Sequence, residues 1–246
     1  MQYDIFETML VSNNKIFILN HHLHRMLKSA EILNFNTFNL LSKFKIFFDS
    51  SFSYFVNKNI KLTSLTLDKF KKIDNLWFNF QDFSKMLGLE SMELDNKNYI
   101  LKLILKCDGN LIYEVLQLNK FANSNIIISK NIINSNNIFL YHKTTNRNIF
   151  KDSVGDIQLN KCFDYIYFNE KHELTQGSRS NIIIKFNGSY LTPNVKSGLL
   201  RGTLSKLLLD SKICKETIIY MEDLLNAEKI FCVNSVRGIL QVNLQE

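Results

Sequence analysis

A lysine that follows a short apolar run is the residue most able to do chemistry in this chain. Lys143 comes after Ile138 to Tyr141 and is followed by Thr144 and Thr145. A lysine that bonds covalently to a carbonyl group needs an amine that is partly neutral, which desolvation or a nearby positive charge provides. The apolar run predicts a buried strand over residues 137–143 that ends at this lysine. The small hydroxyl residues after it leave room for a planar ligand.

The arginines are few and stand inside short motifs. Lysine makes up most of the 30 basic residues. Because lysines are so common here, the simple alternative is that Lys143 is an exposed residue in a turn with no catalytic role. The five arginines are Arg25, Arg147, Arg179, Arg201 and Arg237. Because a guanidinium is planar and always charged, we interpret their retention as a sign of anion binding.

Two loops could bind an anion. The stretch Ser197 to Ser205 contains glycines and a threonine and leads into an apolar helix near Leu204. Glycine and Thr203 at a helix start expose backbone N–H groups, and the helix dipole favours negative charge. The second loop, Asn234 to Gly238, follows a predicted strand and offers the hydroxyl of Ser235. Taken alone, the two loops would be an ordinary helix cap and a polar turn.

Arg25 lies on a predicted early helix, where it could reach a phosphate group. The simple alternative is a surface arginine. Its neighbours His21, His22 and His24 have no well-spaced acidic or thiol partners nearby, so we expect no metal site.

Alternating and helical apolar patterns predict an α+β fold of two domains. Residues 1–119 form the first, with hairpins over 5–19 and 99–118 and helices over 21–33 and 37–55. A polar linker over residues 120–124 leads to the second domain, 125–246. The elements expected there are strands at 126–129, 137–143, 164–168, 181–186 and 229–233, and helices after Gly202 and Met221.

Composition excludes several classes of protein. The chain of 246 residues is 46% hydrophobic and 22% charged, which is typical of a globular protein. Its net charge of +7 is spread along the sequence without a basic run between aromatics, so we expect a small anionic substrate and no nucleic acid. Without a signal peptide or a long apolar run, we expect a cytoplasmic protein that binds no membrane. Four scattered cysteines favour reduced thiols.

Several of these motifs together resemble the class IV, or fold type IV, pyridoxal-phosphate enzymes over nearly the whole chain. The motifs are Phe6-Glu7-Thr8, His22-Leu23-His24-Arg25, Ser29-Ala30, Lys143 to Arg147, Thr175 to Asn181, Leu191-Thr192-Pro193, Gly198 to Gly202 and Asn234 to Gly238. The resemblance implies the two-domain architecture of the D-amino acid aminotransferases. Within the family, the Lys-Thr-Thr-Asn-Arg and Asn-Ser-Val-Arg-Gly motifs are most similar to those of aminodeoxychorismate lyases.

The resemblance implies a role for each matching residue. Lys143 would bind pyridoxal 5'-phosphate and act as general base, Thr8 would assist proton transfer, and Arg25 would bind the phosphate. The other implied cofactor contacts are Gln176, Thr203, Leu204 and Ser235. The candidates for binding the substrate are Arg147, Arg179, Arg237 and Lys106. The family builds its site near a subunit interface, so we expect a homodimer.

Two departures from the family pattern bear on function. Gln176 stands where the family usually has glutamate, and Lys106 to Asn110 lacks the usual arginine and glycine pattern. A glutamate keeps the cofactor's ring nitrogen protonated, whereas an amide can hydrogen-bond but supplies no charge. Elimination depends less on that charge than transamination does, because the electrons leave with the departing group.

We therefore expect a lyase that converts 4-amino-4-deoxychorismate to 4-aminobenzoate and pyruvate, a step toward folate. One alternative is a branched-chain or D-amino acid aminotransferase of the same fold. The other is a binding protein without catalytic activity on a degenerate scaffold, with which the net charge of +7 and Gln176 are also compatible.

Overall fold

A computed structural model describes residues 3–38, 40, 44, 70, 72–87 and 94–245 of the chain. These residues form two compact units. The first contains the described residues up to Asn119 together with His142–Asn146, and the second contains Lys120–Tyr141 and the described residues from Arg147 on.

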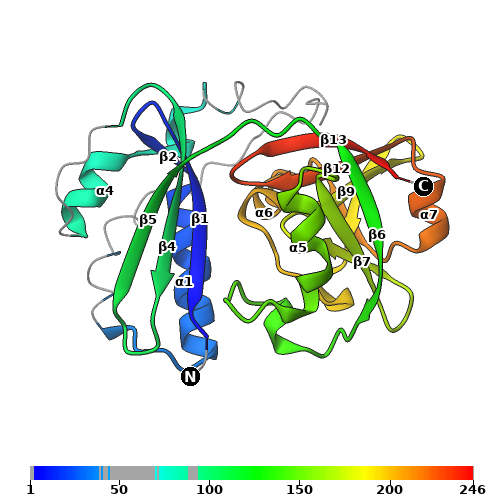
Figure 1. Cartoon of the computed structure of the whole chain (residues 1–246), viewed down its shortest axis with the longest axis horizontal. Helices are drawn as coiled ribbons and strands as arrows, with labels where there is room; N and C mark the ends of the chain where they lie inside the picture. Colours follow the sequence, from blue (N-terminus) through cyan, green and yellow to red (C-terminus); the bar gives the residue numbers. More distant parts are fainter. Residues whose placement is uncertain are drawn as a thin grey trace. The chain divides into compact units, whose positions relative to one another are not determined.

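The first unit is built on an antiparallel sheet with the strand order β3-β2-β1-β4-β5. Its strands are β1 (Ile5–Ser12), β2 (Lys15–Phe17), β3 (Trp77–Asn79), β4 (Asn98–Leu105) and β5 (Leu111–Gln117). The helix α1 (Leu19–Ile32) lies along this sheet, and the shorter α4 (Phe80–Met86) belongs to the same unit (Figure 1). Both hairpins predicted from the sequence are confirmed.

Local residue types explain the first hairpin and its helix. Asn13 and Asn14 take φ values of 49° and 57° in the β1–β2 turn, a left-handed conformation that asparagine tolerates. Ile5, Met9 and Val11 alternate along β1 and pack in one core with the buried face of α1. The carboxylate residue Glu7 occupies the same row of β1 as these apolar residues and is fully buried.

The second unit is built on an eight-stranded mixed sheet with the order β11-β10-β9-β12-β13-β6-β7-β8. Its strands are β6 (Asn125–Ile133), β7 (Asp164–Asn169), β8 (Leu174–Gly177), β9 (Asn181–Phe186), β10 (Ser189–Pro193), β11 (Lys215–Thr217), β12 (Lys229–Asn234) and β13 (Gly238–Leu244). Its helices are α5 (Lys151–Gln158), α6 (Thr203–Asp210) and α7 (Met221–Leu225), which Figure 1 shows around the sheet. Buried side chains of β7, β9 and β12 form much of its hydrophobic core.

The strand predicted over residues 137–143 is wrong. Residues Ile138–Leu140 form a single 3-10 turn, and Ile138 is 46% exposed. The side chain of Asn137 accepts a hydrogen bond from the N–H of Phe139 at 3.0 Å and starts this turn. A short apolar run cannot distinguish a strand from a buried turn by periodicity. Lys143, which the sequence placed in the second domain, belongs to the first unit.

Most of the other strands and helices predicted for the second domain are present, but several elements were not predicted. The strands near 126, 164, 181 and 229 and the helices after Gly202 and Met221 are confirmed. Strands β8, β10, β11 and β13 and the helix α5 were not predicted. Most of the helix predicted over residues 37–55 lies outside the described residues.

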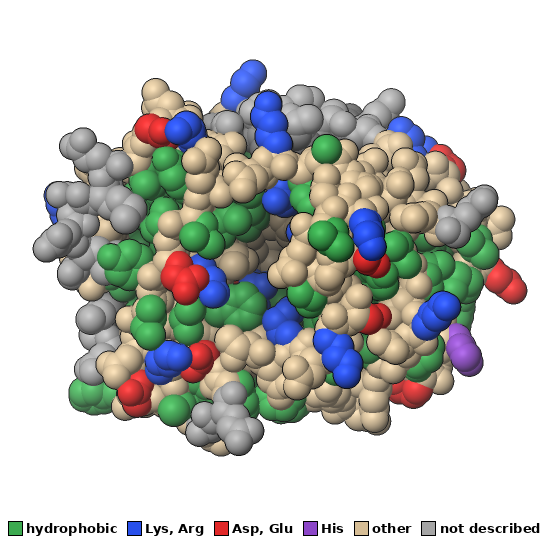
Figure 2. Space-filling model, viewed as in Figure 1, with side chains coloured by type: hydrophobic (Ala, Val, Ile, Leu, Met, Phe, Trp, Pro, Cys, Tyr) green, Lys and Arg blue, Asp and Glu red, His purple; other side chains and the backbone are tan. Residues whose placement is uncertain are grey.

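The surface has no single charged character on the face drawn in Figure 2, where lysine and arginine side chains are interspersed with acidic and uncharged ones. In the part of the chain that the structure describes, no helix is long and apolar enough to cross a membrane.

Candidate active site

Lys143 is attached to the start of strand β1. The N–H of Phe6 donates to the Lys143 carbonyl at 2.9 Å, and the N–H of Thr145 donates to the carbonyl of Asp4 at 2.8 Å. The hydroxyl of Thr145 accepts from the N–H of Asp4 at 2.9 Å. The Nζ atom of Lys143 lies 4.5 Å from the centroid of the Phe6 ring. Backbone hydrogen bonds therefore fix the position of Lys143, and its amine packs over the aromatic ring of Phe6.

Thr8 is carried on the same strand face as the ring that receives the lysine. Side chains alternate along a strand, so Thr8 and Phe6 point to one face of β1 and Glu7 points to the other. The amine of Lys143 meets Phe6 on that face. One strand thus positions both residues for which proton transfer is predicted.

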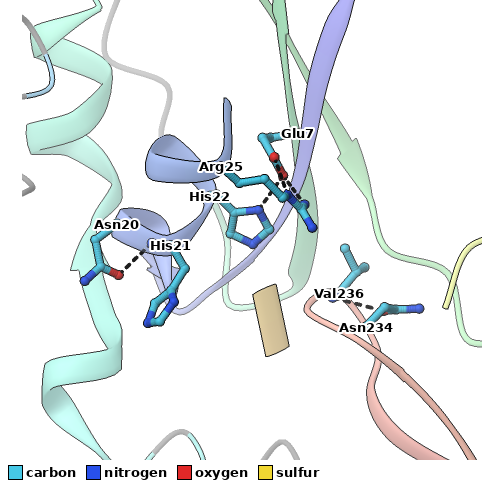
Figure 3. A network of polar contacts seen from close by, with 7 residues as sticks. All are labelled: Glu7, Asn20, His21, His22, Arg25, Asn234 and Val236. Atoms are coloured by element: carbon cyan, nitrogen blue, oxygen red, sulfur yellow. Dashed lines mark hydrogen bonds and ion pairs between the residues drawn. The ribbon is translucent and has the colours of Figure 1, made fainter. Parts of the chain in front are cut away.

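On the opposite face of β1, Glu7 joins α1 through a buried ionic network (Figure 3). Arg25 donates from Nε to Glu7 Oε1 at 2.7 Å and from Nη2 to Glu7 Oε2 at 2.5 Å. His22 Nδ1 lies 2.7 Å from Glu7 Oε2. Glu7 and His22 are fully buried, and the Arg25 side chain is 15% exposed. In the preceding turn, the His21 N–H donates to the side-chain oxygen of Asn20.

Electrostatics sets the protonation state of this network. Burial alone raises the pKa of Glu7, but the charge and hydrogen bonds of Arg25, with those of His22, lower that pKa to about 2. Burial lowers the pKa of His22, and the positive charges of Arg25 and Lys143 lower it further against the opposing effect of Glu7. Because an ionised Glu7 only accepts hydrogen bonds, a neutral His22 carries its proton on Nδ1. The network holds the guanidinium of Arg25 in a fixed orientation.

In the second unit, the start of α6 is arranged for an anion. The N-cap residue Gly202 provides no side-chain cap, and no acidic residue stands in the first turn. Thr203 and Leu204, which begin the helix, are buried. The first N–H groups of a helix have no partner within the helix, and the dipole favours a negative ligand there.

Asn181 fixes the loop before this helix. Its side chain donates to the Leu200 carbonyl at 2.8 Å and accepts from the Gly202 N–H at 3.0 Å. A Cβ atom at Gly202 would lie 2.0 Å from Asn181 Oδ1, so the loop needs glycine at this position. The Oε1 atom of Gln176, on β8, accepts from the Leu200 N–H at 3.2 Å. Gln176 and the loop before α6 are therefore joined by a hydrogen bond.

The turn after Gln176 is held by a buried carboxylate. Asp164 accepts hydrogen bonds from the Ser178 and Ser180 hydroxyls, each at 2.5 Å. It also accepts from the backbone N–H groups of Ser178 at 2.9 Å and Arg179 at 3.2 Å. Burial raises the pKa of Asp164 in spite of these contacts. The buried carboxylate of Asp164 thus fixes the turn that follows β8.

The loop that carries Ser235 has a fixed backbone. The side-chain oxygen of Asn234 accepts from the N–H groups of Val236 at 3.1 Å and Arg237 at 2.8 Å. Figure 3 shows the first of these contacts. Ser235, at the tip between them, is only 7% exposed.

Two of the arginines suggested for substrate binding have structural contacts. Arg147 donates to the carbonyl of Ser178 and lies 4.8 Å from the Phe150 ring centroid. Arg179 donates to the carbonyl of Phe163, and its guanidinium lies 4.7 Å from that residue's ring centroid. Planar stacking and carbonyl binding both suit a guanidinium better than an ammonium.

The other two candidates also have contacts within their units. Arg237 lies 5.3 Å from the ring centroid of Phe121, and Lys106 forms an ion pair with Asp4 at 2.7 Å. Substrate binding by any of the four residues stays a prediction.

Four residues that organise these sites were not predicted to have a role. They are Glu7, His22, Asn181 and Asp164. Glu7 had a usable signal, since a charged residue in the apolar row of a strand must be buried with a partner. Asp164 begins an apolar strand and had no comparable signal. Among the described residues, no group of three or more His, Cys, Asp or Glu side chains could hold a metal ion.

Comparison with known proteins identifies the family. The model of the family described as amino-transferase class IV matches residues 111–244. The chain belongs to this family. Class IV aminotransferases are pyridoxal-phosphate enzymes, so the chain is an enzyme with pyridoxal 5'-phosphate as its cofactor.

Individual relatives support the same fold. A candidate aminodeoxychorismate lyase of Schizosaccharomyces pombe is 31% identical over 103 residues, which cover 40% of this chain and 45% of that protein. The matched stretch therefore spans less than half of this relative's length. A candidate amino-acid aminotransferase from Mesorhizobium loti aligns over 99% of this chain and 100% of its own, with 20% identity and a TM-score of 0.72. A candidate 4-amino-4-deoxychorismate lyase from Legionella pneumophila aligns over 98% of this chain and 82% of its own, with 16% identity and a TM-score of 0.66.

The residues present fit the cofactor of the class IV family. A buried helix start at Thr203 and Leu204 suits a phosphate group, and the close approach of Gly202 to Asn181 keeps the loop in that shape. Lys143 is fixed by its backbone and would supply the amine. Phosphate binding at the start of α6 and covalent attachment at Lys143 stay predictions.

Proposed function

We propose that this class IV enzyme is a lyase that converts 4-amino-4-deoxychorismate to 4-aminobenzoate and pyruvate. The observation that carries the choice between lyase and aminotransferase is the neutral amide of Gln176, buried on β8. The family resemblance assigns this position to the ring nitrogen of the cofactor, where the usual residue is an acid. An amide provides no negative charge to keep that nitrogen protonated. Similarity to the Schizosaccharomyces pombe protein supports the same choice.

Pyridoxal phosphate, when bound, links covalently to an amine and withdraws electrons from the carbon attached to that amine. Lys143 would hold the cofactor, and its amine would accept the proton of the substrate ring carbon that bears nitrogen. Removal of this proton completes the aromatic ring while the enolpyruvyl group leaves. Lys143 is suited to this task because its backbone is paired with β1 and its side chain has a defined position at Phe6.

Thr8 completes the proton transfer in this proposal. Strand alternation puts its side chain on the β1 face that also carries Phe6, and the Phe6 ring contacts the amine of Lys143. It would donate a proton to the leaving enolpyruvyl group. Loss of this hydroxyl should slow the departure of the enolpyruvyl group from the substrate ring and should change cofactor affinity less.

Phosphate binding is proposed for Arg25, Thr203, Leu204 and Ser235. Arg25 provides a fixed guanidinium, and the α6 start provides the N–H groups of Thr203 and Leu204. Ser235 provides a hydroxyl from the β12–β13 loop. The net charge of +7 favours a substrate that carries two carboxylates.

Product analysis tests the proposal. Purified enzyme with cofactor and 4-amino-4-deoxychorismate should form 4-aminobenzoate and pyruvate in equal amounts without an added keto acid. The Lys143→Ala variant should form neither product. Rapid exchange with leucine or D-alanine that depends on an acceptor, with no pyruvate from 4-amino-4-deoxychorismate, would establish the aminotransferase alternative instead.

A further inference from the structure

The orientation of the Gln176 side chain is fixed by a neighbouring peptide group. Its Oε1 atom lies 3.2 Å from the backbone nitrogen of Leu200. A backbone N–H can only donate, so the amide atom that meets it must be the oxygen. The NH2 group of Gln176 is therefore the end directed away from Leu200.

The Leu200 peptide is itself held in place. Asn181 donates to the Leu200 carbonyl and accepts from the N–H of Gly202, so one side chain spans the loop on both sides of Arg201. Rotation of the Gln176 amide by half a turn would place two donors against each other in a partly buried site. Leaving a buried hydrogen bond unmade is costly, so the observed orientation is strongly preferred.

One buried carboxylate of this unit contacts the turn after Gln176. Asp164 is the buried carboxylate that holds the turn after Gln176. Its oxygens accept from the hydroxyls of Ser178 and Ser180 and from the backbone N–H of Arg179. These contacts direct Asp164 at the turn, so it does not substitute for the missing glutamate.

We infer that Gln176 donates its amide N–H to the ring nitrogen of pyridoxal phosphate, which therefore accepts this hydrogen bond and remains unprotonated in the bound cofactor. The inference rests on the proposed function, which assigns Gln176 to the ring nitrogen. A protonated ring nitrogen would present its own N–H to the amide donor. Gln176 is thus a specificity-determining residue, because an unprotonated ring withdraws fewer electrons and favours elimination over transamination.

Nitrogen NMR of the holoenzyme tests this inference directly. The enzyme is reconstituted with pyridoxal phosphate labelled with 15N in the ring, and its chemical shift is compared with those of protonated and unprotonated reference compounds. We expect the unprotonated shift for the wild type. The Gln176→Glu variant should move the resonance to the protonated position and raise the amount of amine-form cofactor relative to pyruvate. The Gln158→Glu control, at an exposed position on α5, should leave the resonance unchanged.

The possible outcomes separate this inference from the proposed function. A wild-type enzyme that releases pyruvate while its ring nitrogen is protonated would overturn the inference and leave the lyase proposal standing. An unprotonated ring in an enzyme that releases no pyruvate would support the inference and overturn the lyase proposal. The wild-type spectrum decides the inference even where Gln176→Glu fails to fold.

Discussion

Arg25 and Glu7 form a two-point ion pair between α1 and β1, with Nε to Oε1 at 2.7 Å and Nη2 to Oε2 at 2.5 Å. A fork-to-carboxylate contact fixes the plane of the guanidinium as well as its position. The carboxylate is fully buried, so the contact is little screened by solvent. The pair therefore links the stability of the first unit to the residue proposed to bind phosphate.

Glu7→Gln should destabilise the protein in a pH-dependent manner. The pKa of Glu7 is lowered to about 2 from a usual value of 4.5, so its stabilising effect is complete above pH 4.5 and is lost as the pH falls toward 2. The shift corresponds to about 3 kcal/mol. The free energy of unfolding, measured by denaturant titration, should differ between wild type and variant by about this amount at pH 7, and the difference should shrink at low pH. The exposed Glu31→Gln should show no such difference.

Arg25→Ala should weaken cofactor binding. Removal of a charge-assisted hydrogen bond costs about 1.5 to 3 kcal/mol, which is roughly a ten- to hundredfold loss of affinity. Titration of the apoenzyme with pyridoxal phosphate measures this loss. Arg25→Lys should be intermediate because it keeps the charge and loses the fork. An unchanged affinity in Arg25→Ala would remove this residue from the phosphate site, and Lys15→Ala, exposed in the first hairpin, serves as the control.

Gly202→Ala should also reduce cofactor affinity, for a steric reason. The added Cβ would lie 2.0 Å from Asn181 Oδ1 and force apart the loop that precedes α6. Gly155→Ala is the matched control, because nothing lies within 4 Å of a Cβ there and alanine favours the α5 helix by about 0.5 to 1 kcal/mol. We expect the control to keep its cofactor and gain slightly in melting temperature. Equal cofactor affinity in both variants would contradict the proposed role of the loop.

Lys143→Ala should abolish covalent attachment of the cofactor together with turnover. Borohydride reduction followed by peptide mass spectrometry locates the attachment, which we expect at Lys143 in the wild type and nowhere in the variant. Circular dichroism should show an intact fold, since the hydrogen bond between Phe6 and Lys143 joins backbone groups and does not need the lysine side chain. Lys97→Ala, at an exposed turn, should behave as the wild type. Wild-type amounts of reduced cofactor on another lysine would disprove the assignment.

Elements that depend on residues adjacent in the sequence could be predicted. The first hairpin follows from Asn13 and Asn14 in its turn and from alternation along β1, both of which are readable in the sequence. The α6 helix and its glycine-containing start could likewise be predicted, and so could the family. These features depend on a few neighbouring residues.

Features that depend on distant residues were not predicted. Lys143 was expected at the end of a strand, whereas its position comes from pairing with Phe6, which lies far away in the sequence. Strand β8 is four residues long, too short for a periodicity signal, although it carries Gln176. The buried contacts of Asp164 come from a turn 14 to 16 residues away and cannot be read from local sequence.

The number of pyruvate molecules released per enzyme molecule without any keto acid decides between the lyase and the aminotransferase. Elimination returns the cofactor to its aldehyde form, so a lyase should release many equivalents of pyruvate from 4-amino-4-deoxychorismate, and the cofactor spectrum at the end should match that at the start. An aminotransferase would stop after one equivalent of amino donor, with its cofactor in the amine form, and resume only when 2-oxoglutarate is added. Sustained pyruvate release without acceptor is the result we predict. No pyruvate release, with only one equivalent of amino donor consumed, would contradict the lyase proposal.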